Sequence, residues 1–382
     1  MSFDLSEDQL EIREMASSFA ANEIAPYALE WEEAKTLPLD LLRAAAALGM
    51  AGIYTGKEFG GVGLGRLDAV VLFEALATGC PTISAFLSIH NMATWMIDSF
   101  GADVLRARLV PDLVAMRLIA SYCLTEPGCG SDAAALTTRA RRDGGEYVLN
   151  GTKQFVSGAG VSDVYVTMAR TGGEGAGGIS AIVVPKNSPG LSFGANERKM
   201  GWHAQPTRTV TFEDCRVPIT HGLGNEGGGF RIAMMGLDGG RLNIAACSLG
   251  GARAALERTI GYMGQRKAFG RRLDEFQALQ FRLADMVTQI EASRALLYRA
   301  AAALDREDPS ATSLIAMAKR FVTDACFTVV DEALQLHGGY GYLAEFGIEK
   351  LVRDLRVHRI LEGTNEIMSL IISRALLAEA RQ

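Results

Sequence analysis

The first candidate for chemistry is a single carboxylate, Glu362, in an apolar stretch near the end of the chain. Two apolar residues precede it and Gly363 follows it. Thr364 or Asn365 is then suited to cap the start of a helix. The sequence therefore predicts that Glu362 lies on a turn between two helices.

Two effects compete for the pKa of this carboxyl group. A helix that begins at Thr364 favours the anion by about 0.3–1 kcal/mol, whereas complete burial can raise the pKa by about 3–5 pH units. If the turn faces a dry cleft, Glu362 is a general base with a pKa near neutrality. The alternative is a solvated glutamate on a helix connection, and this segment alone leaves both open.

The length and composition of the chain limit which kinds of fold could position such a residue. The chain has 382 residues, which is too long for one ordinary core and predicts two or three domains. Hydrophobic residues make up 48% and charged residues 21%, which is a globular composition. The net charge of −6 argues against a nucleic-acid surface, because such a surface needs concentrated basic side chains.

Neither metal binding nor a membrane span is expected. The six cysteines include no C-x-x-C pair and the five histidines no H-E-x-x-H pattern. Residues 75–97 lack charged side chains, but Gly79 and Pro81 favour two buried helices joined by a turn. The acidic N-terminus has no signal character, which predicts a cytoplasmic protein, or a mitochondrial matrix protein if a transit peptide has been removed.

Apolar periodicity divides the chain into three predicted domains. Residues 1–118 are predicted to be helical, with Ser6 and Gln9 as a capping box. Residues 119–226 predict a β-domain, in which Asn150-Gly151 indicates a hairpin between two short strands. Residues 227–382 are predicted to be helical again. This order is not the strand-helix alternation of a doubly wound nucleotide fold, so two G-x-G-x-x-A matches, at 128–133 and 339–344, are rejected as dinucleotide motifs.

Three motifs together resemble the acyl-CoA dehydrogenase family, and the resemblance covers almost the whole chain. They are LTEPGCGSD at 124–132, QLHGGYG at 335–341 and EGT at 362–364. Cys129 departs from the family, which more often has Ala or Ser there. The resemblance implies an α+β fold with a helical N-terminal domain, a central antiparallel β-barrel-like domain and a C-terminal four-helix bundle. It also implies a homotetramer with bound FAD.

The family resemblance also implies a reaction. In the family, a glutamate removes the α-proton of an acyl-CoA while the β-hydrogen leaves as a hydride to the flavin, and electrons pass on to an electron-transfer flavoprotein. Glu362 matches that glutamate. Residues 90–101, 201–208 and 360–366 most resemble the short branched-chain members, which implies oxidation of isobutyryl-CoA to methacrylyl-CoA in valine catabolism. Butyryl-CoA and 2-methylbutyryl-CoA stay open as substrates, because one methylene changes specificity only modestly.

The matched motifs imply the other site residues. Those expected along the flavin ring and its phosphate tail are Tyr122, Leu124, Thr125, Gly130, Ser131, Phe155, Val156 and Ser157. Those expected at the pyrophosphate and adenine half, across a subunit boundary, are Arg266, Phe276, Gln277, Gln335, Leu336, Gly338 and Gly339. Further cofactor contacts after the base are Thr364, Asn365 and Glu366, and the expected CoA contacts are Ser131, Asp238, Arg241 and Arg374.

Each assignment has a plain structural alternative. Glycines at 128 and 130 permit close approach to a ligand, or simply form a tight turn. Phe155 and Ser157 share a strand face by the two-residue period, which suits a flavin surface or an ordinary core strand. The guanidinium of Arg266 suits a diphosphate, although most single arginines lie at the surface. Arg241 and Arg374 could be simple ion-pair residues.

Three function classes follow from these residues. The first is an FAD-dependent acyl-CoA dehydrogenase, and the second is a flavin oxidase of the same fold. The third is a non-catalytic acyl-CoA-binding protein. Glu362 argues against the second class, because relatives with other chemistry commonly change this base. The presence of the flavin-site residues argues against the third class.

Overall fold

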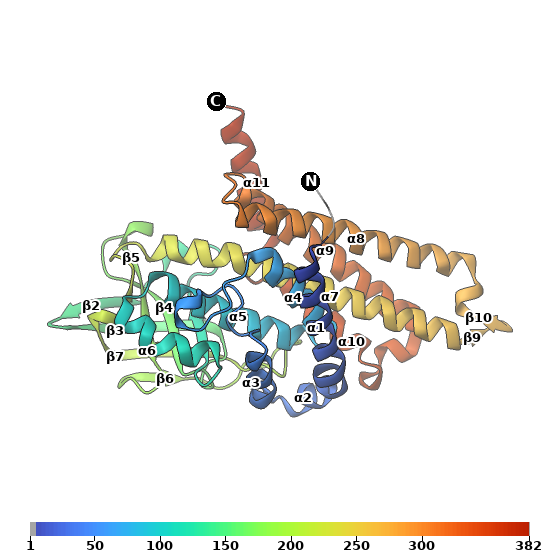
Figure 1. The fold of residues 1–382 in the computed structure, drawn as a ribbon, viewed down its shortest axis with the longest axis horizontal. Helices are drawn as coiled ribbons and strands as arrows, with labels where there is room; N and C mark the ends of the chain where they lie inside the picture. The colour runs from blue at the N-terminus through green and yellow to red at the C-terminus, as the bar shows by residue number, and fades with distance from the viewer. Residues whose placement is uncertain (1–4, 382) are drawn as a thin grey trace.

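The structure, a computed structural model, describes residues 5–381 (Figure 1). Residues 1–4, which open the acidic N-terminus, and residue 382 lie outside the described part. Helices come first and last along the chain, and the strands of the main sheet come between them. In Figure 1 this sheet occupies one end of the molecule, and the long C-terminal helices extend to the other end.

The first third of the chain is helical, as predicted. Its α-helices are α1 (Glu7–Phe19), α2 (Ala28–Ala34), α3 (Leu39–Ala47), α4 (Arg66–Ala77), α5 (Pro81–Phe100) and α6 (Asp103–Val114). The capping box at Ser6 and Gln9 is confirmed. The uncharged stretch 75–97 is the end of α4 and most of α5, joined by a turn and largely buried. None of the described helices is long and apolar enough to cross a membrane.

The middle third forms one eight-stranded sheet. Its strands are β1 (Ala120–Cys123), β2 (Arg139–Asp143), β3 (Glu146–Ser157), β4 (Val164–Arg170), β5 (Ile179–Pro185), β6 (Leu191–Phe193), β7 (Thr207–Pro218) and β8 (Gly222–Leu223). They lie in the order β6-β7-β3-β2-β4-β5-β8, and β1 pairs with β4. The expected sheet was antiparallel and barrel-like. In the observed sheet β4 pairs in parallel with β1 and β2, and the described strands do not close into a barrel.

The predicted hairpin at Asn150-Gly151 is wrong. β3 runs without a turn through both residues and pairs with β2 on one side and β7 on the other. Gly151 has φ 147° at a register shift, and its backbone lies so close to Thr138 that a Cβ would be 2.5 Å from the hydroxyl oxygen. The Asn-Gly pair therefore makes a β-bulge. The actual two-residue turn is Gly144-Gly145, between β2 and β3.

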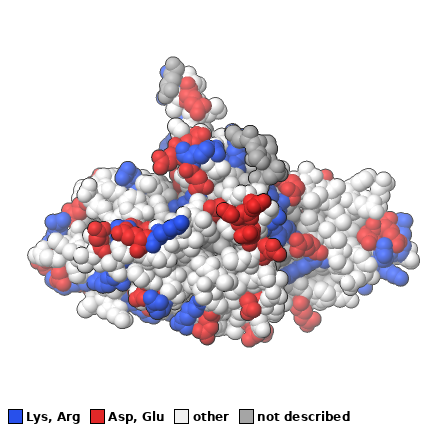
Figure 2. All heavy atoms as spheres, in the orientation of Figure 1, with Lys and Arg blue, Asp and Glu red and all other residues white. Residues whose placement is uncertain are grey.

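The last third is dominated by long helices, as predicted. They are α7 (Gly229–Gln265), α8 (Gln277–Asp305), α9 (Ala311–His337), α10 (Ile348–Arg356) and α11 (Asn365–Glu379). A small hairpin of β9 (Lys267–Ala268) and β10 (Arg271–Arg272) separates α7 from α8. α7, α8 and α9 pack along one another, while α11 packs on α9 and then projects from the body (Figure 1). Acidic and basic groups are intermixed on the face shown in Figure 2.

Candidate active site

Glu362 lies on the connection between a short turn at Val357–Arg359 and α11. Its φ of 56° is in the left-handed region, which few residues other than glycine adopt, and Gly363 follows with φ 88°. Thr364 ends the connection, because its hydroxyl accepts a hydrogen bond from the backbone N–H of Ile367 at 3.4 Å. The predicted turn between two helices is confirmed.

One oxygen atom of the Glu362 carboxyl group is shielded by the body of the protein, although the residue as a whole is only half-buried. Its Oε2 atom is buried and has no hydrogen-bond partner among residues 5–381. It lies against α7 at Gly240, where an added Cβ would stand 2.5 Å from Oε2. Burial raises the pKa of Glu362 to about 7, although the positive charges of Arg241 and Lys319 oppose the rise. Desolvation therefore outweighs the two positive charges at this residue.

Two cations hold the connection by its backbone and leave the carboxylate unbonded. Arg241 on α7 donates from Nε to the carbonyl oxygen of Glu362 at 3.1 Å, and from Nη1 to Asp238 at 2.8 Å. Lys319 on α9 donates from Nζ to the carbonyl oxygen of Gly363 at 2.7 Å and to Oδ1 of Asn365 at 2.9 Å. Lys319 was missed in the sequence; a lysine among the apolar residues of a long helix was the available signal.

Tyr122 on β1 belongs to the same shielded region. Its hydroxyl is buried and lacks a hydrogen-bond partner within the described part of the chain. Burial raises the pKa of Tyr122 well above its usual range, and the nearby carboxylate of Glu362 adds to this effect. Two buried oxygen atoms of this region, one from each residue, are thus left without protein partners.

A buried ion pair fixes the turn that follows β1. The carboxylate of Glu126 accepts hydrogen bonds from the backbone N–H of Thr137 at 2.7 Å and of Thr138 at 2.9 Å, and forms an ion pair with Lys153 at 2.8 Å. Lys153 also donates to the carbonyl oxygen of Leu124 at 3.0 Å. Although burial opposes it, these partners lower the pKa of Glu126 to about 2. Sequence reasoning missed both charges, although Glu126 lies inside the 124–132 motif.

The turn that this ion pair stabilises contains small residues with free space around them. Gly130 and Ser131 are exposed, and an added Cβ at Gly128 or Gly130 would meet no atom within 4 Å. Across the sheet, the side chain of Phe155 is 63% exposed and its φ is 57°. A β-bulge between Lys153 and Val156 accounts for this conformation, so the regular two-residue alternation assumed for this strand does not hold here.

Five of the predicted cofactor residues share one cleft at the far end of α7 and α9. The cleft has a volume of about 450 Å³ and is lined by Arg266, Gln335, Leu336, Gly338 and Gly339, together with aromatic side chains such as Tyr262 and Tyr340. Phe276 and Gln277, at the start of α8, are not among the residues that line it. The structure thus joins residues 70 positions apart into one surface.

The remaining predicted residues lie in varied places. Leu124, Thr125, Val156 and Ser157 border the 124–131 turn, where the backbone N–H of Gln154 donates to Thr125 and the side chain of Gln205 donates to Ser157. Asn365 is buried, and its amide bonds Thr323 and Asp324 on α9. Glu366 and Arg374 are exposed on α11, and neither joins the group around the Glu362 carboxylate.

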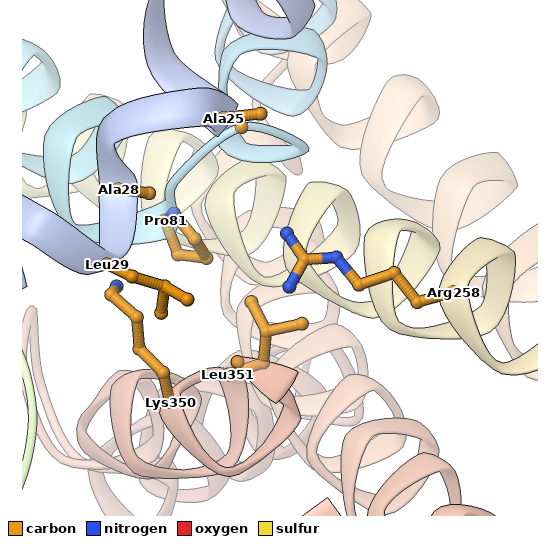
Figure 3. A pocket seen from close by; sticks show the side chains of 9 residues that line it. Ala25, Ala28, Leu29, Pro81, Arg258, Lys350 and Leu351 are labelled. Carbon is orange, nitrogen blue, oxygen red and sulfur yellow. The ribbon is translucent and has the colours of Figure 1, made fainter. Parts of the chain in front are cut away.

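A second cavity of about 180 Å³ lies apart from this site (Figure 3). It is bounded by α2, α7, α10 and the turn between α4 and α5, and Arg258 extends toward it from α7. None of the residues predicted for cofactor or substrate lines this cavity.

Comparison with known proteins places the chain that carries this carboxylate in one family. Profiles described as the N-terminal, middle and C-terminal domains of acyl-CoA dehydrogenase match residues 6–117, 121–215 and 227–377. The chain belongs to the acyl-CoA dehydrogenase family and is an oxidoreductase of that class.

Individual relatives cover nearly the whole chain. Mitochondrial isobutyryl-CoA dehydrogenases of Bos taurus and Dictyostelium discoideum are each 53% identical to it, over 99% and 98% of this chain and 91% and 90% of their own. The solved butyryl-CoA dehydrogenase of Megasphaera elsdenii is 36% identical, with a TM-score of 0.95 over 99% of this chain and all of that one. A structure described as an electron transferring flavoprotein of Acidaminococcus fermentans is 39% identical, with a TM-score of 0.96 over 99% of this chain and all of that one. A structure described as PigA with FAD and proline is 32% identical, with a TM-score of 0.95 over 98% of this chain and 99% of that one.

Proposed function

We propose that the protein oxidises a short branched acyl-CoA, isobutyryl-CoA, to its α,β-unsaturated product, methacrylyl-CoA, with Glu362 as the general base. The observation that carries the proposal is the buried, unpartnered Oε2 atom of a glutamate whose pKa is about 7. The choice of substrate is supported by the 53% identity with two isobutyryl-CoA dehydrogenases. Butyryl-CoA and 2-methylbutyryl-CoA are the alternative substrates.

The proposed role suits the chemistry of the substrate. The α-proton of a thioester is a weak acid, so a fully hydrated carboxylate removes it poorly, whereas a base of pKa near 7 does so better. Because Glu362 has no partner to give up, its Oε2 can approach the α-carbon directly. Arg241 and Lys319 bind the backbone on either side, which holds the carboxylate in one position. Proton transfer then leaves a neutral acid, which burial tolerates.

We propose FAD as the cofactor, and when bound it supplies the acceptor for the β-hydrogen. The open turn at 128–131 and the exposed ring of Phe155 fit a flavin, because the turn leaves room for close approach and the ring is free to stack. The Arg266 cleft fits the diphosphate and adenine half. In this proposal the cofactor site consists of all the cofactor residues given in the sequence analysis: those expected along the flavin ring and phosphate tail, those expected at the pyrophosphate and adenine half, and Thr364, Asn365 and Glu366.

For the coenzyme A part of the substrate we keep Ser131, Asp238, Arg241 and Arg374 as proposed contacts. Asp238 and Arg241 form an ion pair with each other, and Arg241 also bonds the Glu362 carbonyl. These two therefore serve first to support the base and only second to meet the ligand. Ser131 and Arg374 are exposed and available to a ligand.

We further propose an electron-transfer flavoprotein as the electron acceptor and a homotetramer as the assembly. Large apolar side chains are exposed at the ends of α8 and α11 and on the β9–β10 hairpin, where a partner would cover them: Phe269, Phe281, Leu376 and Leu377. The two boundaries between the three domains, at 118/119 and 226/227, also stay a proposal. The cytoplasm or the mitochondrial matrix is the proposed location, and the two relatives are described as mitochondrial.

Anaerobic reduction of the bound flavin tests the function. Purified protein is mixed without oxygen with isobutyryl-CoA, butyryl-CoA or isovaleryl-CoA, and the loss of flavin absorbance is followed. We expect isobutyryl-CoA to give the highest kcat/KM. If isovaleryl-CoA bleaches the flavin fastest, the substrate is wrong; if no acyl-CoA bleaches it, the reaction class is wrong.

A further inference from the structure

Arg66 is half-buried with its Nη1 atom shielded from solvent, it packs against the same helix as Glu362, and the reaction as proposed gives it no task. Arg66 begins α4, and its guanidinium lies between two aromatic rings. Its Cζ atom is 3.7 Å from the centre of the Tyr54 ring and 4.9 Å from that of Trp95. These contacts on two rings fix the direction of the side chain. The guanidinium cannot swing away without losing both.

Arg66 and Glu362 lie against consecutive glycines of α7. A Cβ added at Gly239 would stand 2.4 Å from Nη1 of Arg66, just as one at Gly240 would stand 2.5 Å from Oε2 of Glu362. Neighbouring positions on a helix point about 100° apart, so the two side chains border the same stretch of the α7 surface. Tyr54 joins them, because it contacts Arg66 and lies within electrostatic reach of Glu362.

Helix α5 covers the same space from the opposite side. The sulfur of Met92 would lie 3.2 Å from a Cβ at Gly240, and Trp95 lies one turn later, over the guanidinium of Arg66. Any acyl group whose α-carbon meets Glu362 must therefore fit between α5 and α7. The carboxylate of Glu362 borders this space at Gly240, and the guanidinium of Arg66 borders it at the preceding residue, Gly239.

The contacts of Arg66 do not indicate a purely structural role for this side chain. Nη1 is buried with no hydrogen-bond partner, and the side chain forms no ion pair with the described residues. The nearby carboxylate of Asp305 instead accepts from the backbone N–H groups of Arg66, at 2.6 Å, and Leu67, at 2.9 Å. The carboxylates of Asp305 and Asp238 attract the guanidinium of Arg66 but form no ion pair with it within the described part of the chain, and its closest partner is the ring of Tyr54. An apolar residue at this position would avoid the cost of desolvating the cation.

We propose that Arg66 closes the far end of the acyl site and limits the substrate to short acyl chains. This inference rests on the proposed function. A longer apolar chain would press against a desolvated guanidinium whose N–H groups it cannot bond, and the two rings prevent that group from moving aside. A short branched chain ends before reaching it. Arg66 is thus a specificity-determining residue and not a catalytic residue.

Two variants separate the bulk of Arg66 from its charge. Arg66→Ala opens the end of the site, and Arg66→Met keeps a long side chain without charge. For each, kcat/KM is measured with hexanoyl-CoA and with isobutyryl-CoA in one preparation of holoenzyme, so that a lowered folded fraction cancels from the ratio. We expect the hexanoyl-to-isobutyryl ratio to rise about tenfold or more in Arg66→Ala and by a smaller factor in Arg66→Met.

Arg258→Ala is the matched control, because Arg258 is a second arginine facing a cavity (Figure 3), and Glu362 does not line that cavity. Its ratio should equal that of the wild type. An unchanged hexanoyl-to-isobutyryl ratio of kcat/KM in the Arg66 variants would overturn the inference. If Arg66→Ala does not fold, the ratio measured for Arg66→Met alone decides. If the wild type itself prefers hexanoyl-CoA or oxidises neither substrate, the proposed function fails instead.

Discussion

At position 362 one carboxyl group meets three requirements at once. Its Oε2 atom is shielded from water, that atom is free of hydrogen bonds, and the backbone on either side is fixed by Arg241 and Lys319. The left-handed φ of 56° stores local strain, which these cations and the cap at Thr364 hold in place. At this residue a locally unfavourable backbone conformation is maintained, and it holds a base that is ready to accept a proton.

The pH dependence of the reaction follows from the pKa of Glu362. The base works only as a carboxylate, and its pKa is raised to about 7, so the active fraction grows as pH rises through that value. We expect kcat/KM for isobutyryl-CoA to increase about tenfold per pH unit below 7 and to level off above it. A profile that is flat from pH 5 to 9 would contradict the assigned pKa.

The turn that carries Glu362 could be predicted from the sequence, but the pKa of its carboxyl group could not. The EGT motif and the helix cap are local, so they are readable from a few neighbouring residues. The partners that decide the pKa are not local: Arg241 is 121 positions away and the glycines that admit the carboxylate are on the same distant helix. Lys319 and Arg66 were missed for the same reason, because their importance depends on what folds against them.

At the scale of elements, the sheet owes its shape to pairing between distant strands. The helical character of residues 1–118 and 227–382 was predicted, because apolar spacing and caps are local signals. The Asn150-Gly151 turn failed because β7 pairs along the whole of β3 and turns the pair into a bulge. β2 was missed because three of its five residues are arginines, which carry no apolar alternation.

We expect the Lys153–Glu126 ion pair to be the main interaction that stabilises the 124–131 turn. Both side chains are almost wholly buried, so Lys153→Met leaves an unpaired buried carboxylate. We expect a loss of about 3–5 kcal/mol in the free energy of unfolding, measured by denaturant titration. Arg43→Ala, which breaks the exposed pair with Asp40, should cost less than about 1 kcal/mol. Equal losses in the two variants would count against this role.

At the scale of the whole molecule, one chain leaves much of its apolar surface uncovered. α11 projects from the body with Leu376 and Leu377 more than half exposed, and the β9–β10 hairpin presents Phe269 at 97% exposure (Figure 1). Surfaces of this kind usually mark contacts with a partner. The Arg266 cleft lies at the same end as the hairpin, so assembly and cofactor binding are expected to depend on each other.

Light scattering tests the proposed assembly. The wild type should have four times the mass of one chain, and the double variant Leu376→Glu with Leu377→Glu should give a smaller species, because two buried charges in an interface are costly. Val104→Glu, at an 82% exposed position on α6, is the control and should leave the mass unchanged. A wild type that is monomeric at micromolar concentration would refute the tetramer.

The most direct test of the account is the rate of flavin reduction in Glu362→Gln. The amide keeps the size of the side chain but cannot take a proton, so the variant should still bind FAD and isobutyryl-CoA. Stopped-flow measurement without oxygen should show reduction slowed by about 10²–10⁴-fold relative to the wild type. Reduction at a rate near that of the wild type would contradict the assignment of Glu362 as the base.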